Sequence, residues 1–285
     1  HHLWDLNAVN YPWLMEKRKR RFFGDPTPIQ RNYLIDEHIK LANELGFKGS
    51  VHIQVGAADG LEEAQWINSV VNENQSWPMV QVAFCDLSSD QRELHLDKLQ
   101  KLSSVVGVRQ IIGRSPAEDA NNKTNELLTS DNFMQGLQSI SDRGLTFDLQ
   151  IIPELLKTCA SVFSQFPNLH VILCHAGSPY NRTLGGIKSW AGDLIHLSNL
   201  SNVSCKLSGL GMFDHNWTGS TVAPIVTTVM DQFGSKRVMF GSNFPVDSLS
   251  SSFEQLFTRL SSNIDEKDFE DVFSKTAQRI YFSNF

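Results

Sequence analysis

The feature that most constrains the fold of this chain is a repeated pattern, in which a short apolar run is followed by an amphipathic segment. Eight apolar runs read as buried strands: one near Leu3, then Ser50–Val55, Val80–Cys85, Val105–Ile112, Thr146–Ile152, His170–Cys174, Val203–Leu207 and Arg237–Phe240. Their spacing averages roughly 30 residues, the length of one strand with its helix. This alternation predicts a parallel sheet covered by helices, and eight units favour closure into a barrel.

The segments between the runs repeat apolar residues at helical spacing. They predict helices over Tyr33–Leu45, Leu61–Asn74, Asp90–Leu102, Asp131–Asp142, Glu154–Phe166, Ile187–Leu197 and Thr221–Phe233, and a pair within Ser251–Tyr281. Gly46, Gly144 and Gly234 stand where three of these helices end. No GxGxxG follows the first run, so a dinucleotide-binding fold has no support. We therefore expect an α/β protein, a (β/α)8 TIM barrel that residues 1–285 form as a single domain.

Composition indicates a soluble protein that binds a small molecule. Hydrophobic residues make up 41% of the chain and charged residues 20%, and the net charge of -6 argues against nucleic acid or an anionic membrane as a partner. The four cysteines show no CxxC pairing, so we expect buried free thiols and a cytoplasmic location. The composition leaves open whether the protein forms a homo-oligomer. Because HHLWDL begins in the middle of a pattern, we expect either missing amino-terminal residues or the end of a tag.

Polar residues gather at the carboxyl ends of the predicted strands, where barrel enzymes hold their chemistry. Such residues are costly to bury unless they hydrogen-bond to one another or to a ligand. We therefore expect a common pocket. Its candidate residues are His2, Trp4, His52, Gln54, Asp86, Arg109, Asp148, Gln150, His175, Lys206, Ser208, Asn243 and Asp247.

Several of these residues have two interpretations. His175 follows an apolar strand, and the next residues, Ala-Gly, allow a tight turn that presents its imidazole to the pocket. His52 and Asp148 either form a structural hydrogen-bonded pair or act in catalysis. Arg109 either neutralises an aspartate or binds a substrate carboxylate in a bidentate manner. Lys206 either acts in the pocket or is the partner in a structural ion pair.

Two connections are longer than a helix needs. The segment Asp5–Asn32 contains the basic run Glu16–Phe23, which reads either as a solvated loop or as a flap that offers a cation to an acidic substrate. The segment Gly113–Ser130 is polar and rich in asparagine, and we expect it to be a loop.

Seven motifs, taken together and in order, resemble a known family. They are HHLWDL (residues 1–6), VHIQ (51–54), GVRQII (107–112), FDLQI (147–151), CHAGSP (174–179), KLSGLGM (206–212) and FGSNFPVD (240–247). The set is similar to the amidohydrolase-2 family of the amidohydrolase superfamily, and within it to sugar lactonases and the hydrolase of 2-pyrone-4,6-dicarboxylate. The resemblance spans essentially the whole chain and implies a distorted TIM barrel in which water attacks a lactone or similar carbonyl.

The resemblance also implies a set of site residues. His2 matches the second histidine of the family's HxH on strand one, whose first histidine would precede residue 1, and His175 matches the histidine of strand six. The resemblance therefore makes His2 and His175 candidate zinc ligands together with that preceding histidine. The aspartate expected on strand eight falls on Asn243, whose amide cannot act as a general base near neutral pH. Two alternatives follow for the cofactor: one divalent metal, or a metal-free site as in some lactonases of this family.

We therefore expect a hydrolase that acts on a small, oxygen-rich, carboxylated substrate, most simply a lactone. Either His175, His52 or Asp247 activates water, and Asn243 donates a hydrogen bond to the polarised carbonyl. The residues expected to bind substrate are Trp4, Arg109, Gln150, Arg182 and Ser208. Two other functions remain: a metal-dependent decarboxylase of the same superfamily, and a barrel that binds a metabolite without turnover.

Overall fold

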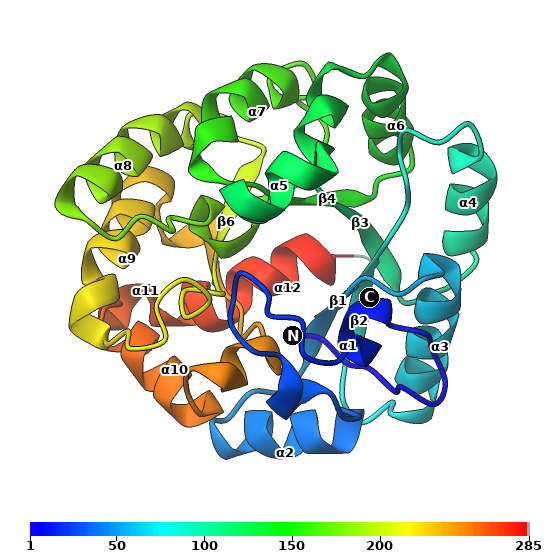
Figure 1. Cartoon of the computed structure of the whole chain (residues 1–285), viewed down its shortest axis with the longest axis horizontal. Coiled ribbons are helices and arrows are strands. Elements are labelled where there is room, and N and C mark those ends of the chain that lie inside the picture. Colours follow the sequence, from blue (N-terminus) through cyan, green and yellow to red (C-terminus); the bar gives the residue numbers. More distant parts are fainter. Residues whose placement is uncertain (284–285) are drawn as a thin grey trace.

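The computed structural model describes residues 1–283, which build one parallel sheet of seven strands inside a ring of helices (Figure 1). The strands are adjacent in sequence order, as the alternation of strands and helices requires. The predicted α/β barrel class is confirmed. The strands are β1 (Ser50–Ile53), β2 (Met79–Ala83), β3 (Val105–Ile111), β4 (Thr146–Gln150), β5 (Val171–Leu173), β6 (Val203–Leu207) and β7 (Val238–Phe240).

The main helices lie where the apolar spacing predicts them, within a few residues at each end. Gly46, Gly144 and Gly234 each follow a helix with a positive φ of 82°, 68° and 72°, which glycine adopts without a steric penalty. The helices are α1 (Pro12–Met15), α2 (Ile35–Glu44), α3 (Gly60–Glu73), α4 (Arg92–Leu99), α5 (Pro116–Asn122), α6 (Asp131–Asp142), α7 (Leu156–Phe163), α8 (Leu184–Ser198), α9 (Gly219–Phe233), α10 (Phe253–Ser261), α11 (Glu266–Glu270) and α12 (Thr276–Tyr281).

The amino-terminal residues lie in the gap between β1 and the loop after β7. The His1 amino group donates to the Val51 carbonyl at 3.2 Å, and the Ile53 N–H donates to the His1 carbonyl at 2.9 Å. On the other side, the His2 N–H donates to the Phe244 carbonyl at 2.8 Å. The segment therefore joins the two edges of the curled sheet.

The strand predicted near Leu3 is nevertheless wrong, and the sheet has seven strands rather than eight in the described residues. The Leu3 N–H donates to the side-chain Nδ1 of His52 at 3.1 Å instead of to a backbone carbonyl. The next residue, Trp4, turns away and forms an isolated antiparallel bridge with Tyr33. Parallel pairing therefore ends after one residue.

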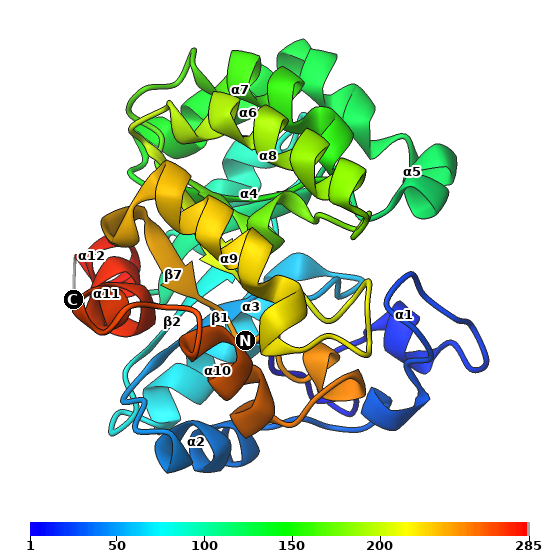
Figure 2. The same ribbon diagram turned by 90° about the vertical axis from the view of Figure 1, so that its left-hand side faces the viewer.

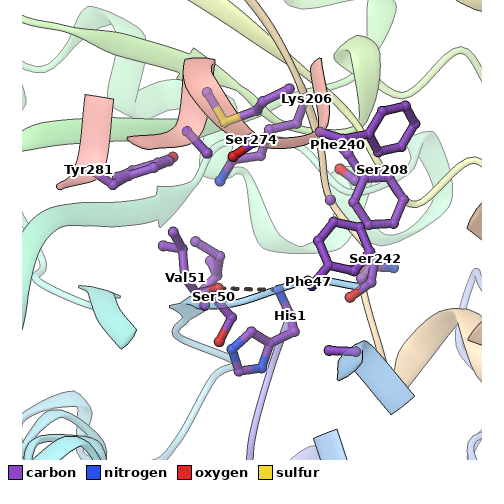
Figure 3. Close-up of a pocket in the computed structure, with 18 of the residues that line it drawn as sticks. His1, Phe47, Ser50, Val51, Lys206, Ser208, Phe240, Ser242, Ser274 and Tyr281 are labelled. Carbon is purple, nitrogen blue, oxygen red and sulfur yellow. Dashed lines mark hydrogen bonds between the residues drawn. The ribbon is translucent and has the colours of Figure 1, made fainter. Parts of the chain in front are cut away.

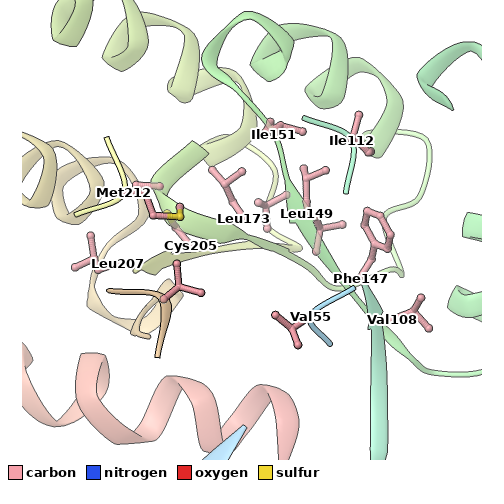
Figure 4. Packing of buried hydrophobic residues seen from close by; sticks show 14 of the residues in the cluster. Val55, Val108, Ile112, Phe147, Leu149, Ile151, Leu173, Cys205, Leu207 and Met212 are labelled. Carbon is pink, nitrogen blue, oxygen red and sulfur yellow. The ribbon is translucent and has the colours of Figure 1, made fainter. Parts of the chain in front are cut away.

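The two faces of the sheet follow the alternation of side chains along each strand. Phe147, Leu149 and Leu207 point outward into the large core between sheet and helices (Figure 4). The alternate set faces inward, and its apolar members, such as Ile172 and Met239, form a second, smaller cluster inside the barrel. Polar residues on the same inward parity must therefore share the barrel interior.

Helix α12 closes the amino-terminal end of the barrel. In the side view it lies with α11 at one end of the molecule, whereas α1 and α5 lie at the opposite end (Figure 2). Ile280 and Tyr281 of α12 pack on the inner cluster, and the Tyr281 hydroxyl donates to Asp148 Oδ1 at 2.7 Å. Helix α12 therefore covers the inner cluster from the amino-terminal side of the sheet.

The segment Gly113–Ser130 is more ordered than predicted. It contains α5 and a 3-10 helix over Thr124–Thr129. Ser115 caps α5 by accepting a hydrogen bond from the Glu118 N–H, and Pro116 occupies the first turn, where a missing N–H costs nothing. The high asparagine content predicted a loop here, although the segment contains this short capped helix.

In residues 1–283, no helix has both the length and the apolar character needed to cross a lipid bilayer.

The buried hydroxyl of Tyr281 leads to a stability prediction. Changing Tyr281 to Phe leaves the Asp148 carboxylate short of one donor, so we expect a loss of about 1–3 kcal/mol in the free energy of unfolding. The matched control is Tyr180→Phe, because Tyr180 also bonds a carboxylate, that of Glu154, but at an exposed position. Its expected loss is within about 0.5 kcal/mol. Urea unfolding of the three proteins compares them, and equal losses in both variants would contradict the role of Tyr281.

Candidate active site

A cavity of about 820 Å³ occupies the barrel interior and the gap between β1 and β7. Figure 3 shows Phe47 and Phe240 on one side of it and Ser50 and Val51 on the other. This part is mainly apolar. The inner wall is polar, and it is formed by His2, Arg109, His175, Lys206, Ser208 and Asn243. All six of these residues are among the candidates that the sequence placed in the common pocket.

His175 enters the cavity from a strained turn at the end of β5. His175 and Ala176 have left-handed backbone conformations, with φ of 56° and 52°, which residues with a Cβ rarely adopt. Ser208, just after β6, meets this turn at two points: its Oγ accepts from the His175 N–H at 3.3 Å and lies 2.9 Å from His175 Nδ1. The strained backbone and the serine together fix the direction of the imidazole.

Gly209 is what allows His175 to lie so close to β6. A Cβ built on Gly209 would stand 2.4 Å from His175 Nδ1 and 2.7 Å from the Cε of Met212. The φ of Gly209, +62°, is also in the left-handed region. Sequence reasoning missed this residue, although the Gly-rich KLSGLGM motif contains it.

The imidazole of His175 is neutral at physiological pH. Burial, followed by the positive charges of Arg109 and Lys206, lowers its pKa to about 3. A neutral imidazole has one nitrogen with a free lone pair. When Nδ1–H donates to Ser208, Nε2 holds that lone pair and can accept a proton.

His2, Asn243 and Asp247 form a chain of contacts at the other side of the site. His2 Nδ1 lies 2.7 Å from the Ile53 carbonyl oxygen, and His2 Nε2 lies 3.2 Å from the amide of Asn243. The same amide contacts Asp247 Oδ1 at 3.0 Å. Asp247 is 2% exposed and does not line the cavity, so it reaches the site only through Asn243.

Arg109 projects into the cavity from β3 and is held by uncharged partners. Its guanidinium donates to the Gln54 carbonyl, and to Gln150 Oε1 at 3.3 Å. In the described chain no carboxylate lies within 4.0 Å of it, and its buried Nε has no hydrogen-bond partner. Of the two sequence interpretations, neutralisation by Asp148 or Asp86 is thus not what the geometry shows. Gln150, predicted to bind substrate, instead supports Arg109.

Lys206 forms an ion pair with Asp148. Its ammonium group pairs with Asp148 Oδ2, while Tyr281 donates to the other carboxylate oxygen. Both charged groups are buried, so each supplies the partner that the other needs. The structural alternative for Lys206 therefore describes the geometry, although its side chain also lines the cavity.

His52 is not part of the cavity wall, contrary to our prediction. Val51 and Ile53 face the interior, so the alternation along β1 directs His52 outward, toward α3. Its Nδ1 accepts the Leu3 N–H, and its Nε2 lies 3.7 Å from Glu63. Glu63 was missed by sequence reasoning, although it occupies an apolar-face position of α3.

Two predicted substrate contacts, Trp4 and Arg182, also lie outside the cavity wall. The indole of Trp4 is fully buried and donates to the Arg31 carbonyl at 2.6 Å. Arg182 donates to the Leu210 carbonyl at 2.8 Å and so supports the loop after β6. Both residues stabilise backbone segments around the cavity and do not line the cavity itself.

The basic run at the carboxyl end of the barrel divides into two parts. Residues 16–20 are exposed, as the solvated-loop interpretation predicts. Arg21 forms two hydrogen bonds to Glu118 of α5, at 3.1 and 3.0 Å, and Phe22 stacks on Phe213 at 5.4 Å. The charge of Arg21 is therefore already paired with Glu118, and Arg21 does not line the cavity.

Residues 1–283 contain two of the histidines that the resemblance assigns to a metal. His2 and His175 line the cavity, but Asn243 stands where the family resemblance expects a carboxylate. Among residues 1–283, no three His, Cys, Asp or Glu side chains group together as metal ligands. Tightly bound zinc takes three or four such ligands in proteins. The described residues thus supply two imidazoles and an amide at this wall, and the metal role of His2 and His175 stays a prediction.

Comparison with known proteins decides the family. A family model described as amidohydrolase matches residues 103–282. The protein y4mH of Sinorhizobium fredii is 31% identical over 260 residues, which are 90% of this chain and 86% of that protein. The chain belongs to the amidohydrolase family. An L-fucono-1,5-lactonase of Burkholderia multivorans is 22% identical over 266 residues, 90% of this chain and 83% of that enzyme. The prediction of a hydrolase is confirmed at this level.

Solved structures share the fold of this amidohydrolase. A zinc-bound amidohydrolase of Burkholderia multivorans superposes with a TM-score of 0.83 at 20% identity, covering 99% of this chain and 96% of that one. A probable 2-pyrone-4,6-dicarboxylic acid hydrolase of Acinetobacter baumannii, solved with citric acid, gives 0.72 at 15% identity, with coverages of 99% and 97%. A 2,6-dihydroxybenzoate decarboxylase of Rhizobium gives 0.60 at 16%, covering 98% of both chains.

Close packing at Gly209 yields a prediction for this amidohydrolase. Gly209→Ala must push His175 aside, so we expect activity to fall by about 10²-fold, as misplacement by an ångström can cause. Gly144→Ala is the control, because its φ of +68° carries the same backbone strain while nothing lies within 4 Å of its Cβ. Gly144→Ala should lose on the order of 1–2 kcal/mol of the free energy of unfolding through backbone strain. Gly209→Ala should lose more than that, because the displacement of His175 and Met212 adds to the same strain. Equal activity of the two variants would show that Gly209 does not position His175.

Proposed function

We propose that this amidohydrolase opens the ring of a lactone by adding water to its carbonyl carbon. The observation that carries the proposal is that a neutral imidazole, an amide and a guanidinium without an acidic partner meet on one cavity wall. Lactone hydrolysis needs a base for water, a donor for the developing oxyanion and a means of orienting the substrate. The names of two relatives, L-fucono-1,5-lactonase and 2-pyrone-4,6-dicarboxylic acid hydrolase, support the same reaction class.

In this proposal His175 is the base. With Nδ1–H donated to Ser208, its Nε2 takes a proton from water while the water oxygen bonds to the carbonyl carbon. Electrons of the carbonyl move onto its oxygen, and the amide N–H of Asn243 stabilises that oxyanion. Collapse of the intermediate breaks the ring C–O bond, and the imidazolium returns the proton to the leaving alkoxide. The product is a hydroxy acid.

Arg109 favours a substrate that bears a carboxylate. Its charge is buried near the cavity without an ion pair, and a guanidinium binds carboxylates through paired N–H donors. An anion there also offsets the positive field that lowers the pKa of His175. Binding of an acidic substrate would thus raise the basicity of His175 when a base is needed.

The second candidate is non-oxidative decarboxylation, because a decarboxylase shares the fold. In related branches of the superfamily that chemistry depends on a metal, whereas the described residues offer an incomplete ligand set. Metal content and the product distinguish the two reactions, since decarboxylation releases carbon dioxide and hydrolysis releases a proton. We give hydrolysis precedence because two relatives are named for it.

The proposal is tested by His175→Gln, with L-fucono-1,5-lactone and 2-pyrone-4,6-dicarboxylate as substrates and proton release as the readout. Removal of the base should lower kcat by about 10²–10⁴-fold. His196→Gln is the control, because it makes the same change at an exposed position of α8. We expect the acidic lactone to have the higher kcat/KM. Full activity of His175→Gln would refute the assignment of the base, and carbon dioxide from a carboxylated substrate would favour the second candidate.

A further inference from the structure

The hydrogen positions of the His2–Asn243–Asp247 chain can be worked out from one fixed contact. His2 Nδ1 lies 2.7 Å from the Ile53 carbonyl oxygen. A carbonyl oxygen only accepts hydrogen bonds, so Nδ1 must carry a hydrogen. If the ring is neutral, Nε2 then has a lone pair and needs a donor.

The amide of Asn243 faces this lone pair with its Oδ1, at 3.2 Å, while its Nδ2 donates to Asp247 Oδ1 at 3.0 Å. With its oxygen toward Nε2, two acceptors face each other, unless His2 carries a second proton and a positive charge. With the amide turned over, Nδ2 donates to Nε2 and the conflict disappears; oxygen and nitrogen of an amide are told apart by such partners. The turned amide then places its oxygen 3.0 Å from Asp247 Oδ1, which must carry a proton to donate there.

Two states are therefore consistent with the distances, and they contain the same number of protons. One has an imidazolium at His2 and a carboxylate at Asp247; the other has two neutral side chains. His2 is 5% exposed and Asp247 2%, and the amide keeps the two charges out of direct contact. Isolated charges are costly to bury, which favours the neutral state.

The surroundings of Asp247 also favour its neutral, protonated state. Within the described residues no lysine or arginine lies within 4.0 Å of it, and its Oδ2 is buried without a hydrogen-bond partner. The groups that face it are the Asn243 amide and the Gly209 N–H, with the imidazoles of His2 and His175 beyond them. Burial raises the pKa of Asp247 to about 7 and lowers that of His2.

We propose that Asp247 is a carboxylic acid that positions Asn243. Its O–H donates to Asn243 Oδ1, and Asn243 Nδ2 donates one hydrogen to His2 Nε2. Nδ2 has a second hydrogen, and Asn243 lines the cavity, so that hydrogen is available to a substrate carbonyl. Ionisation of Asp247 would turn the amide and withdraw this donor. The protonation state is independent of which carbonyl compound is the substrate, whereas the consequence for activity rests on the proposed function.

The first test measures protonation without any substrate. The melting temperatures of the wild type and Asp247→Asn are compared at pH 5 and pH 9. A carboxyl whose pKa is raised by folding contributes stability that is fully present below its unfolded pKa, about 4, and is lost as pH rises to the folded pKa. We expect the wild type to lose stability relative to Asp247→Asn as pH rises through about 7. A difference that stays constant between pH 5 and pH 9 would overturn the proposal.

The control is Asp25→Asn, since hydrogen bonds from Thr27 lower the pKa of the exposed Asp25 and keep it ionised throughout this range. Its difference from the wild type should not change with pH. If Asp247→Asn does not fold, carbon NMR of the aspartate carboxyls in the wild type replaces it. One aspartate carboxyl that titrates near pH 7 supports the proposal, and a spectrum in which no aspartate titrates there overturns the proposal.

Two further readouts separate this proposal from the proposed function. The kcat of the wild type should fall as pH rises above 7, whereas Asp247→Asn, which still has an amide N–H to donate, should keep its activity to higher pH. Zinc bound in a 1:1 ratio by the wild type and lost in His2→Gln would overturn the proposal, because the metal would take the lone pair assigned to Asn243. A stability shift with pH in a protein that hydrolyses no lactone would support Asp247 while removing the proposed reaction.

Discussion

The alternation of side chains along parallel strands is the constraint on which the rest of this structure depends. In a curled sheet every second residue must face the interior, whatever its polarity. The apolar members fill the amino-terminal half of the barrel beneath α12. The polar members, Arg109 on β3, Asp148 on β4 and Lys206 on β6, are then buried together, and each must find a partner from another strand.

These interior charges are not used in the same way. Lys206 and Asp148 neutralise each other, and Tyr281 completes the carboxylate's hydrogen bonds from the carboxyl-terminal helix. The guanidinium of Arg109 donates to the Gln54 carbonyl and the Gln150 amide, and no carboxylate of residues 1–283 lies within 4.0 Å of it, so its charge remains available to an anion. The resulting positive field keeps His175 neutral and, with burial, lowers its pKa. The packing of the barrel thus leaves an arginine without an acidic partner beside a neutral histidine, and the proposed function rests on this pair.

Sequence alone predicted most of the barrel, because apolar runs and helical spacing directly report burial on two faces. It found His175, Arg109 and Asn243 because each follows or interrupts such a run. The prediction that His52 faces the cavity was wrong, because a continuously apolar strand does not reveal which of its alternate residues point into the barrel. Sequence alone also could not show that the Leu3 N–H bonds a side chain rather than a strand, because that contact depends on tertiary structure.

The central claim is that water attacks a lactone carbonyl between His175 and Asn243 while Arg109 holds an acidic group. The most direct measurement is a crystal structure with the hydroxy acid formed from an acidic lactone. The account predicts that the newly formed carboxylate contacts the His175 imidazole and the Asn243 amide, and that the second carboxylate contacts Arg109. A product bound in the apolar part of the cavity, between Phe47 and Val51 and away from His175, would contradict it.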